Sequence, residues 1–479
     1  MLSFPRAGSP SLQHPASASG CEWDGRVLSL HFNAQMSGEE IALDFDGSYF
    51  SSATADARGV ATWAFPFPPR PCVDALPRRG RDGDPLAVAP FELSFAEPSA
   101  RHERAVPFGV DCAAPDVAII VPIYGAPDAV ARCLDSVIEH TTGRARLILI
   151  DDASPDDAIA PQLERYATRA NVTLLHNATN RGFTATANRG IAEAGRADVV
   201  LLNADTEVGP NWLVGLRRAA YCGDDVATAT AVSDNAGAFS VPELERENAL
   251  PAQWSTVDTA RALWQTAGIA YPELPTGNGF CMYMRRSVID AVGVLDEAAF
   301  PQGYGEENDF CQRASARGLR HVIAGNVFVH HERSRSFGHE RRAALGVAGM
   351  AVLRARWPRY EADVGASLHT FERRVLDWRV RRVFADAAIS PRRRVLQVGG
   401  RALDAQQFET LQPPNEDAAT LWDWLQIHGI EAVLVESESQ SPLPHFARLL
   451  GIPLVWDTPD AAALDDALAS ARTFTEQAP

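Results

Sequence analysis

The chain has 479 residues, a formal net charge of −17 at pH 7 and a pI of about 5.2, and 46% of its residues are hydrophobic. This length suggests roughly two to four domains, with enough apolar residues to bury a sizeable core. The acidic balance excludes a general attraction for phosphate backbones, so we expect no nucleic-acid partner. The chain contains no lysine, which excludes any mechanism that needs a catalytic or phosphate-binding lysine.

The use of cysteine and the lack of a long apolar stretch indicate the cellular compartment in which the protein is expected. The seven cysteines are scattered and form no C-x-x-C pair, so neither a disulfide framework nor a zinc site is expected, and a reducing compartment fits. Residues 1–20 are rich in Ser, Pro and Ala without the pattern of a signal peptide, and we expect them to be disordered. No apolar stretch approaches the ~18 residues of a membrane span. We therefore expect a soluble, cytoplasmic protein.

Residues 21–112 show the pattern of a small β-sandwich. Short segments of alternating apolar and polar residues, such as 27–32 and 91–95, are separated by turn residues such as Asp46-Gly47. Alternation interrupted by Gly, Pro and Asp at this spacing is typical of sandwich strands. The segment holds no cluster of catalytic side chains. A purely structural module and a carbohydrate-contacting one both fit its sequence.

Residues 113–370 follow the strand–helix–strand pattern of an α/β domain. Residues 117–121 are a continuous apolar run, as expected of a buried parallel strand, and apolar residues then recur at helical spacing from 130 to 138. Further strands are expected at 147–150, 172–175 and 199–202, and helices at 158–169 and 183–194. The alternation predicts a doubly wound, mostly parallel sheet.

Residues 371–393 carry many arginines interleaved with apolar residues such as Val375, Leu376 and Trp378. This is the pattern of a basic amphipathic helix. Such a helix could bind an anionic membrane surface, which would place the protein peripherally at the inner face of the membrane. A linker helix packed on the sheet domain fits the sequence at least as well.

Residues 394–479 read as a second, short α/β unit of Rossmann-like pattern. Strands are expected at 395–398, 432–435 and 453–456, and helices at 418–428, 444–450 and 461–472. The segments LWDWLQIHGIEAVLVES and LLGIPLVWDTP resemble part of the N-terminal half of a GT-B glycosyltransferase. Because the sequence shows no donor-binding half after it, we assign this unit no activity.

Polar side chains at the carboxyl edge of the predicted sheet form a candidate ligand site. Tyr124, Asp151, Asp152 and Asp205 each follow a predicted strand, and ligands of open α/β sheets bind outside these strand ends. No glycine-rich phosphate loop is present, so a diphosphate would need a divalent cation, for which Asp205 is the best-placed ligand. An ordinary loop aspartate explains the octapeptide 201–208 equally well when it is taken alone.

A second group of acidic residues could supply a general base. The segment GYGEENDF places Glu306 and Glu307 at a glycine-flexible helix start, and neighbouring like charges raise a carboxylate's pKa, as suits a base. Acidic residues also favour a first helical turn electrostatically, so this segment alone is ambiguous. Of the adjacent His330 and His331, only one could join Asp205 on a metal, because neighbouring strand residues face opposite ways.

Linked motifs between residues 116 and 356 resemble inverting family-two glycosyltransferases of GT-A fold. In chain order they read VAIIVPIYG, LILIDDASPD, NRGFTATANRGI, LLNADTEV, TGNGF, GYGEENDFCQRA and VHHERSRSFG. Their order is far more specific than any single motif. The resemblance implies metal-dependent transfer of a sugar from a nucleotide-sugar donor to a hydroxyl of a glycan or lipid-linked glycan, with Mn²⁺ or Mg²⁺ as cofactor.

The resemblance also assigns roles to individual residues. Nucleotide contacts would come from Pro122, Tyr124, Asp152, Arg181, Asn188, Asn203 and Asp205. The sugar and acceptor pocket would involve Gly279, Phe280, Tyr304 and Asp309. Asn203-Ala204-Asp205 would be the DXD motif, with Asp205 and His331 as metal ligands and Glu307 as the base. Asn at the first DXD position implies weaker metal binding, and Glu where many members have Asp leaves Glu306 as a rival base.

These observations favour a hexosyl- or deoxyhexosyl-transferase, with bacterial surface-polysaccharide synthesis expected by resemblance only. The alternative is a degenerate transferase module that serves as a non-catalytic glycan-binding or assembly subunit. Asn203 supports that alternative, whereas Asp205, the acidic residues and His331 oppose it. A sugar nucleotidyltransferase is disfavoured because its glycine-rich signature and lysine are missing.

Overall fold

The computed structural model describes residues 20–23, 27–45, 47–64, 72–86, 90–95, 116–141, 145–332, 339–368, 370–385, 392–398, 402–436, 441–457 and 461–470. The prediction of disorder over 1–20 therefore lies almost wholly outside the described residues. By contact density the chain divides into two compact units, one formed by residues 1–100 with 377–382 and the other by the remainder. In the described part of the chain, no helix has the length and apolar character needed to cross a bilayer.

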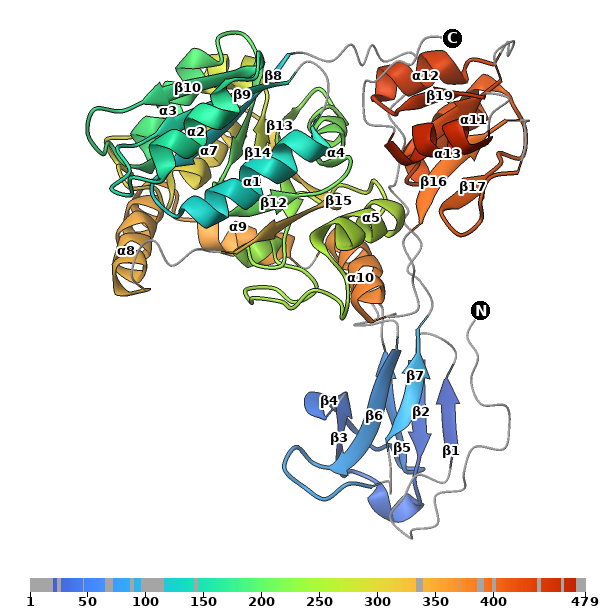
Figure 1. Ribbon diagram of the computed structural model, residues 1–479. Helices are drawn as coiled ribbons and strands as arrows, with labels where there is room; N and C mark the ends of the chain where they lie inside the picture. Colours follow the sequence, from blue (N-terminus) through green and yellow to red (C-terminus); the bar gives the residue numbers. More distant parts are fainter. Residues whose placement is uncertain are drawn as a thin grey trace. The chain divides into compact units, whose positions relative to one another are not determined.

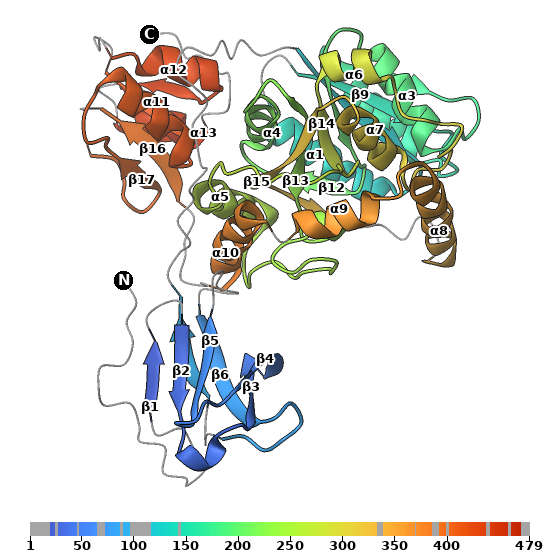
Figure 2. The same cartoon turned by 180° about the vertical axis from the view of Figure 1, so that it is seen from behind.

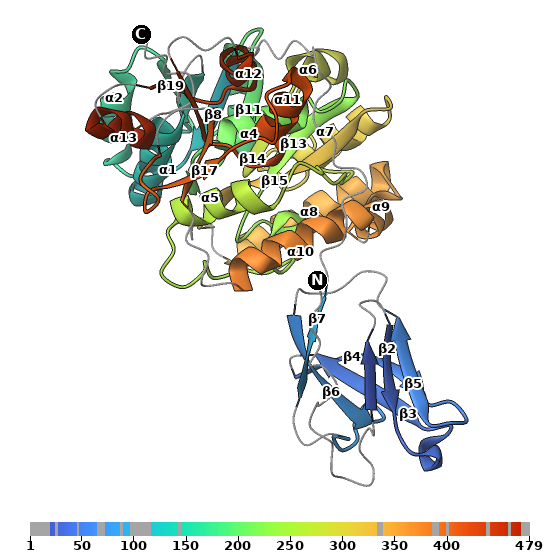
Figure 3. The ribbon, with the colours of Figure 1, turned by 90° about the vertical axis from the view of Figure 1, so that its right-hand side faces the viewer.

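The N-terminal unit is a β-sandwich (Figures 1 and 3). One sheet has the order β1 (Gly20–Trp23), β2 (Val27–His31), β5 (Val60–Ala64), and the other the order β4 (Ser48–Thr54), β3 (Glu40–Phe45), β6 (Cys72–Arg79), β7 (Phe91–Ser94). All neighbouring strands are antiparallel. Leu28, Leu30, Ile41, Leu43 and Leu93, from both sheets, share one core. The alternation of the sequence predicts this packing.

The second unit is built on an eight-stranded sheet (Figure 1). Its strand order is β10 (Val172–His176), β9 (Arg146–Asp151), β8 (Val117–Ile123), β11 (Asp198–Leu202), β14 (Cys281–Met284), β13 (Val226–Val232), β15 (Arg320–His331), β12 (Thr206–Val208). Every strand runs in the same direction except β14 and β12. The mostly parallel α/β sheet is thus confirmed, whereas β12, β13 and β14 are additions that the sequence analysis did not predict.

Helices cover both faces of this sheet (Figures 1 and 2). One face carries α3 (Phe183–Glu193), α6 (Arg286–Val292) and α7 (Glu306–Ser315), and the other carries α1 (Pro127–His140), α2 (Ile159–Ala167), α4 (Trp212–Ala220) and α5 (Thr256–Thr266). On the first face, Ile120 and Leu201 of the strands pack with Ile191, Val288 and Phe310 of the helices. This rigid layer fixes where α3 and α7 begin, beside the carboxyl ends of the strands.

Three helices follow the sheet: α8 (His339–Arg356), α9 (Tyr360–Ser367) and α10 (Phe371–Ala385). In α8, Gly349 leaves no room for a Cβ beside the carbonyl of Tyr304. In α10, Leu376 packs against Gly325 of β15, and the buried Arg373 donates a hydrogen bond to the carbonyl of Ala238 at 2.9 Å. The N-terminal half of α10 therefore packs on the sheet domain. This packing favours a linker helix over a helix whose apolar side chains bind a membrane surface.

The C-terminal residues of the second unit form a parallel four-stranded sheet. Its order is β17 (Phe408–Leu411), β16 (Arg393–Gln397), β18 (Ala432–Val435), β19 (Leu454–Trp456), and its helices are α11 (Ala418–Ile427), α12 (Leu443–Leu450) and α13 (Ala461–Ser470). Glu431, which is buried, pairs with Arg261 of α5 at 3.1 Å. The Rossmann-like pattern is confirmed, with β17 as a strand that the sequence analysis missed.

Candidate active site

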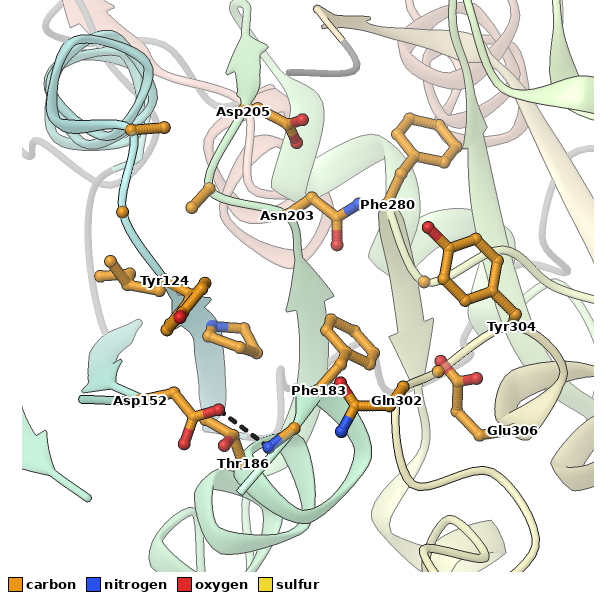
Figure 4. Close-up of a pocket in the computed structure, with 18 of the residues that line it drawn as sticks. Tyr124, Asp152, Phe183, Thr186, Asn203, Asp205, Phe280, Gln302, Tyr304 and Glu306 are labelled. Atoms are coloured by element: carbon orange, nitrogen blue, oxygen red, sulfur yellow. Dashed lines mark hydrogen bonds between the residues drawn. The ribbon is translucent and has the colours of Figure 1, made fainter. Parts of the chain in front are cut away.

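The carboxyl ends of the central strands open into a cavity of about 640 Å³, a volume typical of small-molecule sites. The predicted site residues that line it are Pro122, Tyr124, Asp152, Asn203, Asp205, Gly279, Phe280, Tyr304, Glu306, Glu307 and His331. Figure 4 shows Tyr124 and Asp152 on one side, Tyr304 and Glu306 on the opposite side, and Asn203 between them. Segments far apart in the sequence therefore meet at the predicted edge of the sheet.

Asp152 organises one wall of the cavity. Its buried carboxylate accepts hydrogen bonds from the amide of Asn177 at 2.6 Å, the backbone N–H of Arg181 at 2.8 Å and that of Gly182 at 2.9 Å; Figure 4 shows Asp152 at the cavity. Gly182 has φ +82° and leaves no room for a Cβ beside the carbonyl of Pro301, so this position requires glycine. Two of these three hydrogen bonds end on the Oδ1 atom of Asp152. Asp152 thus fixes the loop that leads into α3.

Some of the predicted residues lie outside the lining of the cavity, namely Asp151, Arg181, Asn188 and Asp309. The side chain of Asn188 donates to the carbonyl of Leu295 at 2.9 Å and accepts from its N–H at 3.1 Å, which ties α3 to that segment. Asp309 is buried and pairs with Arg313 at 2.8 Å and Arg356 at 3.1 Å. The structure gives Asn188 and Asp309 architectural contacts, although both occur in motifs of the resemblance.

The two glutamates at the start of α7 are held at the cavity by an unusual turn. Gly303, Tyr304 and Gly305 all have positive φ, and for Tyr304 (φ +68°) this backbone conformation is unfavourable. The turn ends at Glu306, whose carboxylate accepts the backbone N–H of Gly305 at 3.1 Å. Only 3% of the Glu306 surface is exposed. The strained turn therefore presents both carboxylates to the cavity instead of to solvent.

Burial sets the protonation of this pair. It raises the pKa of Glu306 well above its ordinary range, and the charge of Glu307 raises it further. Burial also raises the pKa of Glu307, but a hydrogen bond with Glu306 opposes that rise. Glu306 consequently retains a proton to higher pH, and Glu307 ionises first. The Oε2 atom of Glu307 is buried and has no hydrogen-bond partner among the described residues.

Asp205 and His331 face each other across the end of the sheet. The pairing of β12 with β15 places Thr206 opposite His331, and the Asp205 Oδ1 atom lies 3.3 Å from His331 Nε2. The ring Nδ1 atom lies 3.0 Å from the carbonyl oxygen of Asn235. A carbonyl can only accept, so Nδ1 carries the proton, and in the neutral ring the Nε2 lone pair faces Asp205.

This donor set fits a divalent cation. An aspartate oxygen and an imidazole nitrogen whose other nitrogen is hydrogen-bonded are common ligands of Mn²⁺ and related metals. Within the ranges that the structure describes, no group of three or more His, Cys, Asp or Glu side chains is placed to hold a metal. Asp205 and His331 would therefore share the cation with oxygens of a substrate or water. His330 faces away from Asp205, as the strand alternation predicts, and pairs with Asp234 at 2.5 Å.

Several cavity residues were not singled out from the sequence, namely Asn180, Phe183, Thr186, Gln302 and Gly346. Phe183 lies within the motif NRGF and Gln302 directly precedes the GYG turn, so both could have been proposed from their neighbours. Gly346 of α8 had no sequence signal, since nothing in its pattern shows that α8 returns to the cavity.

Residues 118–293 match the family model described as glycosyl transferase family 2. The matched segment includes Asp205 and ends before Glu307 and His331. The protein named "Uncharacterized glycosyltransferase YibD" of Escherichia coli (strain K12) is 34% identical over 118 residues, which are 24% of this chain and 33% of that protein. The low-salt glycan biosynthesis hexosyltransferase Agl10 of Haloferax volcanii is 24% identical over 215 residues, 42% of this chain and 61% of that protein.

Among solved structures, the mannosyltransferase PcManGT from Pyrobaculum calidifontis in complex with GDP-Man and Mn²⁺ is 19% identical, with a TM-score of 0.39, over 56% of this chain and 75% of that chain. The chain spans about a third of the length of YibD and about three fifths of that of Agl10. The family match, the relatives and the mostly parallel sheet with its cavity at the strand ends agree with one another. Residues 118–293 of this chain therefore resemble glycosyl transferase family 2.

Proposed function

We propose that the cavity transfers a sugar from a nucleotide-sugar donor to a hydroxyl group of a glycan or lipid-linked glycan, with inversion at the anomeric carbon. The observation that carries this proposal is Glu307, whose buried Oε2 atom has no hydrogen-bond partner among the described residues. An acceptor hydroxyl would satisfy that oxygen. The names of the relatives support the reaction class, and the name of Agl10 supports a hexosyl transfer in glycan biosynthesis.

In the proposed reaction, Glu307 accepts the proton of the acceptor hydroxyl as its oxygen attacks the anomeric carbon. The new carbon–oxygen bond forms as the bond to the diphosphate breaks, and the diphosphate leaves with that electron pair. One displacement from the face opposite the leaving group inverts the configuration. Glu306, which retains its proton to higher pH, hydrogen-bonds to Glu307 and holds it in place.

Opposite the base, Asp205 and His331 would hold a divalent cation, Mn²⁺ or Mg²⁺. When bound, such a cation offsets the charge that develops on the departing diphosphate. The chain contains no lysine that could neutralise a diphosphate. Among the described residues, Asp205 and His331 are therefore the side chains best placed to bring positive charge there, by binding a cation. Tyr124 and the wall organised by Asp152 would then receive the nucleoside.

The experiment is a panel of nucleotide-sugars incubated with the full chain and Mn²⁺, with release of nucleoside diphosphate as the readout. We expect metal-dependent release with one donor, and loss of that release when EDTA is added. Binding of a nucleoside diphosphate without any release, with acceptors present, would instead support a non-catalytic glycan-binding or assembly subunit. Absence of both binding and release would contradict the proposal altogether.

A further inference from the structure

We propose that Asp234 is a positioning residue that presets His331 for metal binding, an inference that rests on the proposed metal site. Asp234 follows β13 directly and is 3% exposed. Neither the motifs of the resemblance nor any sequence pattern singled it out. Its two carboxylate oxygens engage the two adjacent histidines that end β15.

The contacts of Asp234 hold the end of β15 from both sides. Its Oδ1 atom accepts the backbone N–H of His331 at 3.0 Å, and its Oδ2 atom lies 2.5 Å from Nδ1 of His330. One carboxylate therefore fixes the backbone of the proposed ligand and the side chain of the preceding residue. Strand alternation places the His331 ring on the face opposite His330, and the hydrogen bond to the His331 N–H holds the backbone that sets this direction.

The ring of His331 is fixed by two further groups. The carbonyl of Asn235, the residue next to Asp234, accepts the ring Nδ1–H at 3.0 Å. The ring also stacks on Phe280, with ring centroids 5.3 Å apart and an angle of 16° between the planes. Asp234 and Asn235 thus act through one short segment, which sets both the tautomer and the orientation of His331. The Nε2 atom is left facing Asp205, 3.3 Å from its Oδ1 atom.

The segment that carries Asp234 is itself rigid. The side chain of Asn248 donates to the Asp234 carbonyl at 3.2 Å and to the Glu243 carbonyl at 2.9 Å, and its own backbone N–H donates to the Asp234 carbonyl at 2.9 Å. The hydroxyl of Ser233 donates to the Asp234 carboxylate at 3.0 Å. A buried aspartate whose backbone carbonyl and carboxylate both accept from fixed donors would impose its geometry on His331 rather than follow it.

The test measures Mn²⁺ binding to the full chain by calorimetry and by electron paramagnetic resonance, which need no donor or turnover. We expect Asp234→Ala to weaken Mn²⁺ binding about 10- to 100-fold, the range found when outer partners of metal-bound histidines are removed. Asp234→Asn keeps an oxygen that can accept the His331 N–H, and we expect it to restore most of the affinity. Nitrogen-15 NMR of the ring should show the Nδ1–H tautomer of His331 in the wild type and a tautomer mixture in Asp234→Ala.

Asp198→Ala is the matched control. Asp198 is also buried and accepts a backbone N–H, from Arg286 at 2.7 Å, together with a hydroxyl of Tyr283 at 2.6 Å. It begins β11 at the end opposite the cavity, so its removal should lower stability without changing Mn²⁺ affinity. This control separates a lost positioning contact from a general loss of stability.

The outcomes separate this inference from the proposed function. If the wild type binds Mn²⁺ and Asp234→Ala binds it equally well, the positioning role is refuted while the metal site stands. Equal weakening by Asp234→Ala and Asp198→Ala would also refute it, because the effect would then follow stability alone. If the wild type binds no Mn²⁺ with or without nucleoside diphosphate, the proposed metal site itself fails.

Discussion

Alanine at Gly305 should disturb the catalytic glutamates by a calculable amount. Gly305 has φ +139°, and a Cβ built there would lie 2.6 Å from Cε1 of Phe300, whereas ordinary contacts begin near 3.4 Å. The Phe300 ring or the start of α7 must therefore move by about 0.8 Å, the difference between these two distances. Phe300 is 2% exposed and packs with Leu353 of α8, so it has little room to retreat. The displacement should therefore reach Glu307.

Two costs add in this variant. The backbone conformation costs an L-residue about 1–2 kcal/mol, and overpacking costs roughly a further 1–3 kcal/mol. Thermal unfolding followed by circular dichroism should thus show a loss of about 2–5 kcal/mol. A displacement of nearly 1 Å at a catalytic group can lower kcat about 100-fold. We expect that loss of turnover in Gly305→Ala while the Kd for nucleoside diphosphate is unchanged.

Gly318→Ala provides the control at the other end of α7. Gly318 also has a positive φ, +80°, but a Cβ there would meet nothing within 4 Å. This variant should lose only about 1 kcal/mol and keep full turnover. Equal kcat values for Gly305→Ala and wild type would refute the steric reasoning, as would equal losses of kcat in both variants.

Further predictions concern single charged or polar groups. Glu306→Gln should unfold at a higher temperature than wild type near pH 8 and at the same temperature near pH 4. The reason is that the pKa of Glu306 is higher in the folded than in the unfolded state, so that its ionisation destabilises the fold as pH rises. A difference in unfolding temperature that does not depend on pH would contradict this. Asn203→Asp adds a carboxylate beside His331, whose ring is 3.5 Å from the amide, and calorimetry should show Mn²⁺ binding about tenfold tighter; unchanged affinity would place Asn203 outside the metal site. Asp309→Asn should cost about 3 kcal/mol in thermal unfolding by weakening the ion pairs of a buried carboxylate and leave the donor KM unchanged. A raised KM at normal stability would restore its predicted role in the sugar pocket.

Much of the fold could be predicted because its strands are buried on both faces. The apolar run of β8 and the helical spacing in α1 each give a strong local signal. In contrast, β13 reads VATATAV and β12 has three residues. Alternating Val, Ala and Thr fits a strand with one polar face, yet all seven residues of β13 are buried. Neighbours from β14, β15 and α4 enforce that burial, and a single sequence does not show them.

The candidate site divides in the same way. Residues at strand ends or at a helix start, such as Asp205 and Glu307, follow directly from chain order, because parallel strands bring their carboxyl ends to one edge. Residues further along a helix do not. Asn188 and Asp309 share motifs with cavity residues, but each lies on a helix face that packs against another segment. A motif indicates which segment of the chain lies at a site. The side of the helix on which each residue lies then decides which side chains of that segment reach the cavity.

Asp234 had no sequence signal for a different reason. It lies 96 residues before His330 and 97 residues before His331, the two histidines that it contacts. Its position depends on the parallel pairing of β13 with β15, in which Val232 pairs with Phe328. Such partners become visible only once strand order and register are known.

The most direct test of the proposed transfer reaction compares Glu307→Gln with wild type, using the donor identified by the nucleotide-sugar panel. The substitution removes the proton acceptor but keeps the size of the side chain. We predict that kcat falls by about 100- to 10,000-fold, the usual contribution of a general base, while calorimetry gives an unchanged Kd for the nucleoside diphosphate with Mn²⁺. Sugar transfer that persists at the wild-type rate in Glu307→Gln, and in the double variant with Glu306→Gln, would contradict a single displacement assisted by these carboxylates.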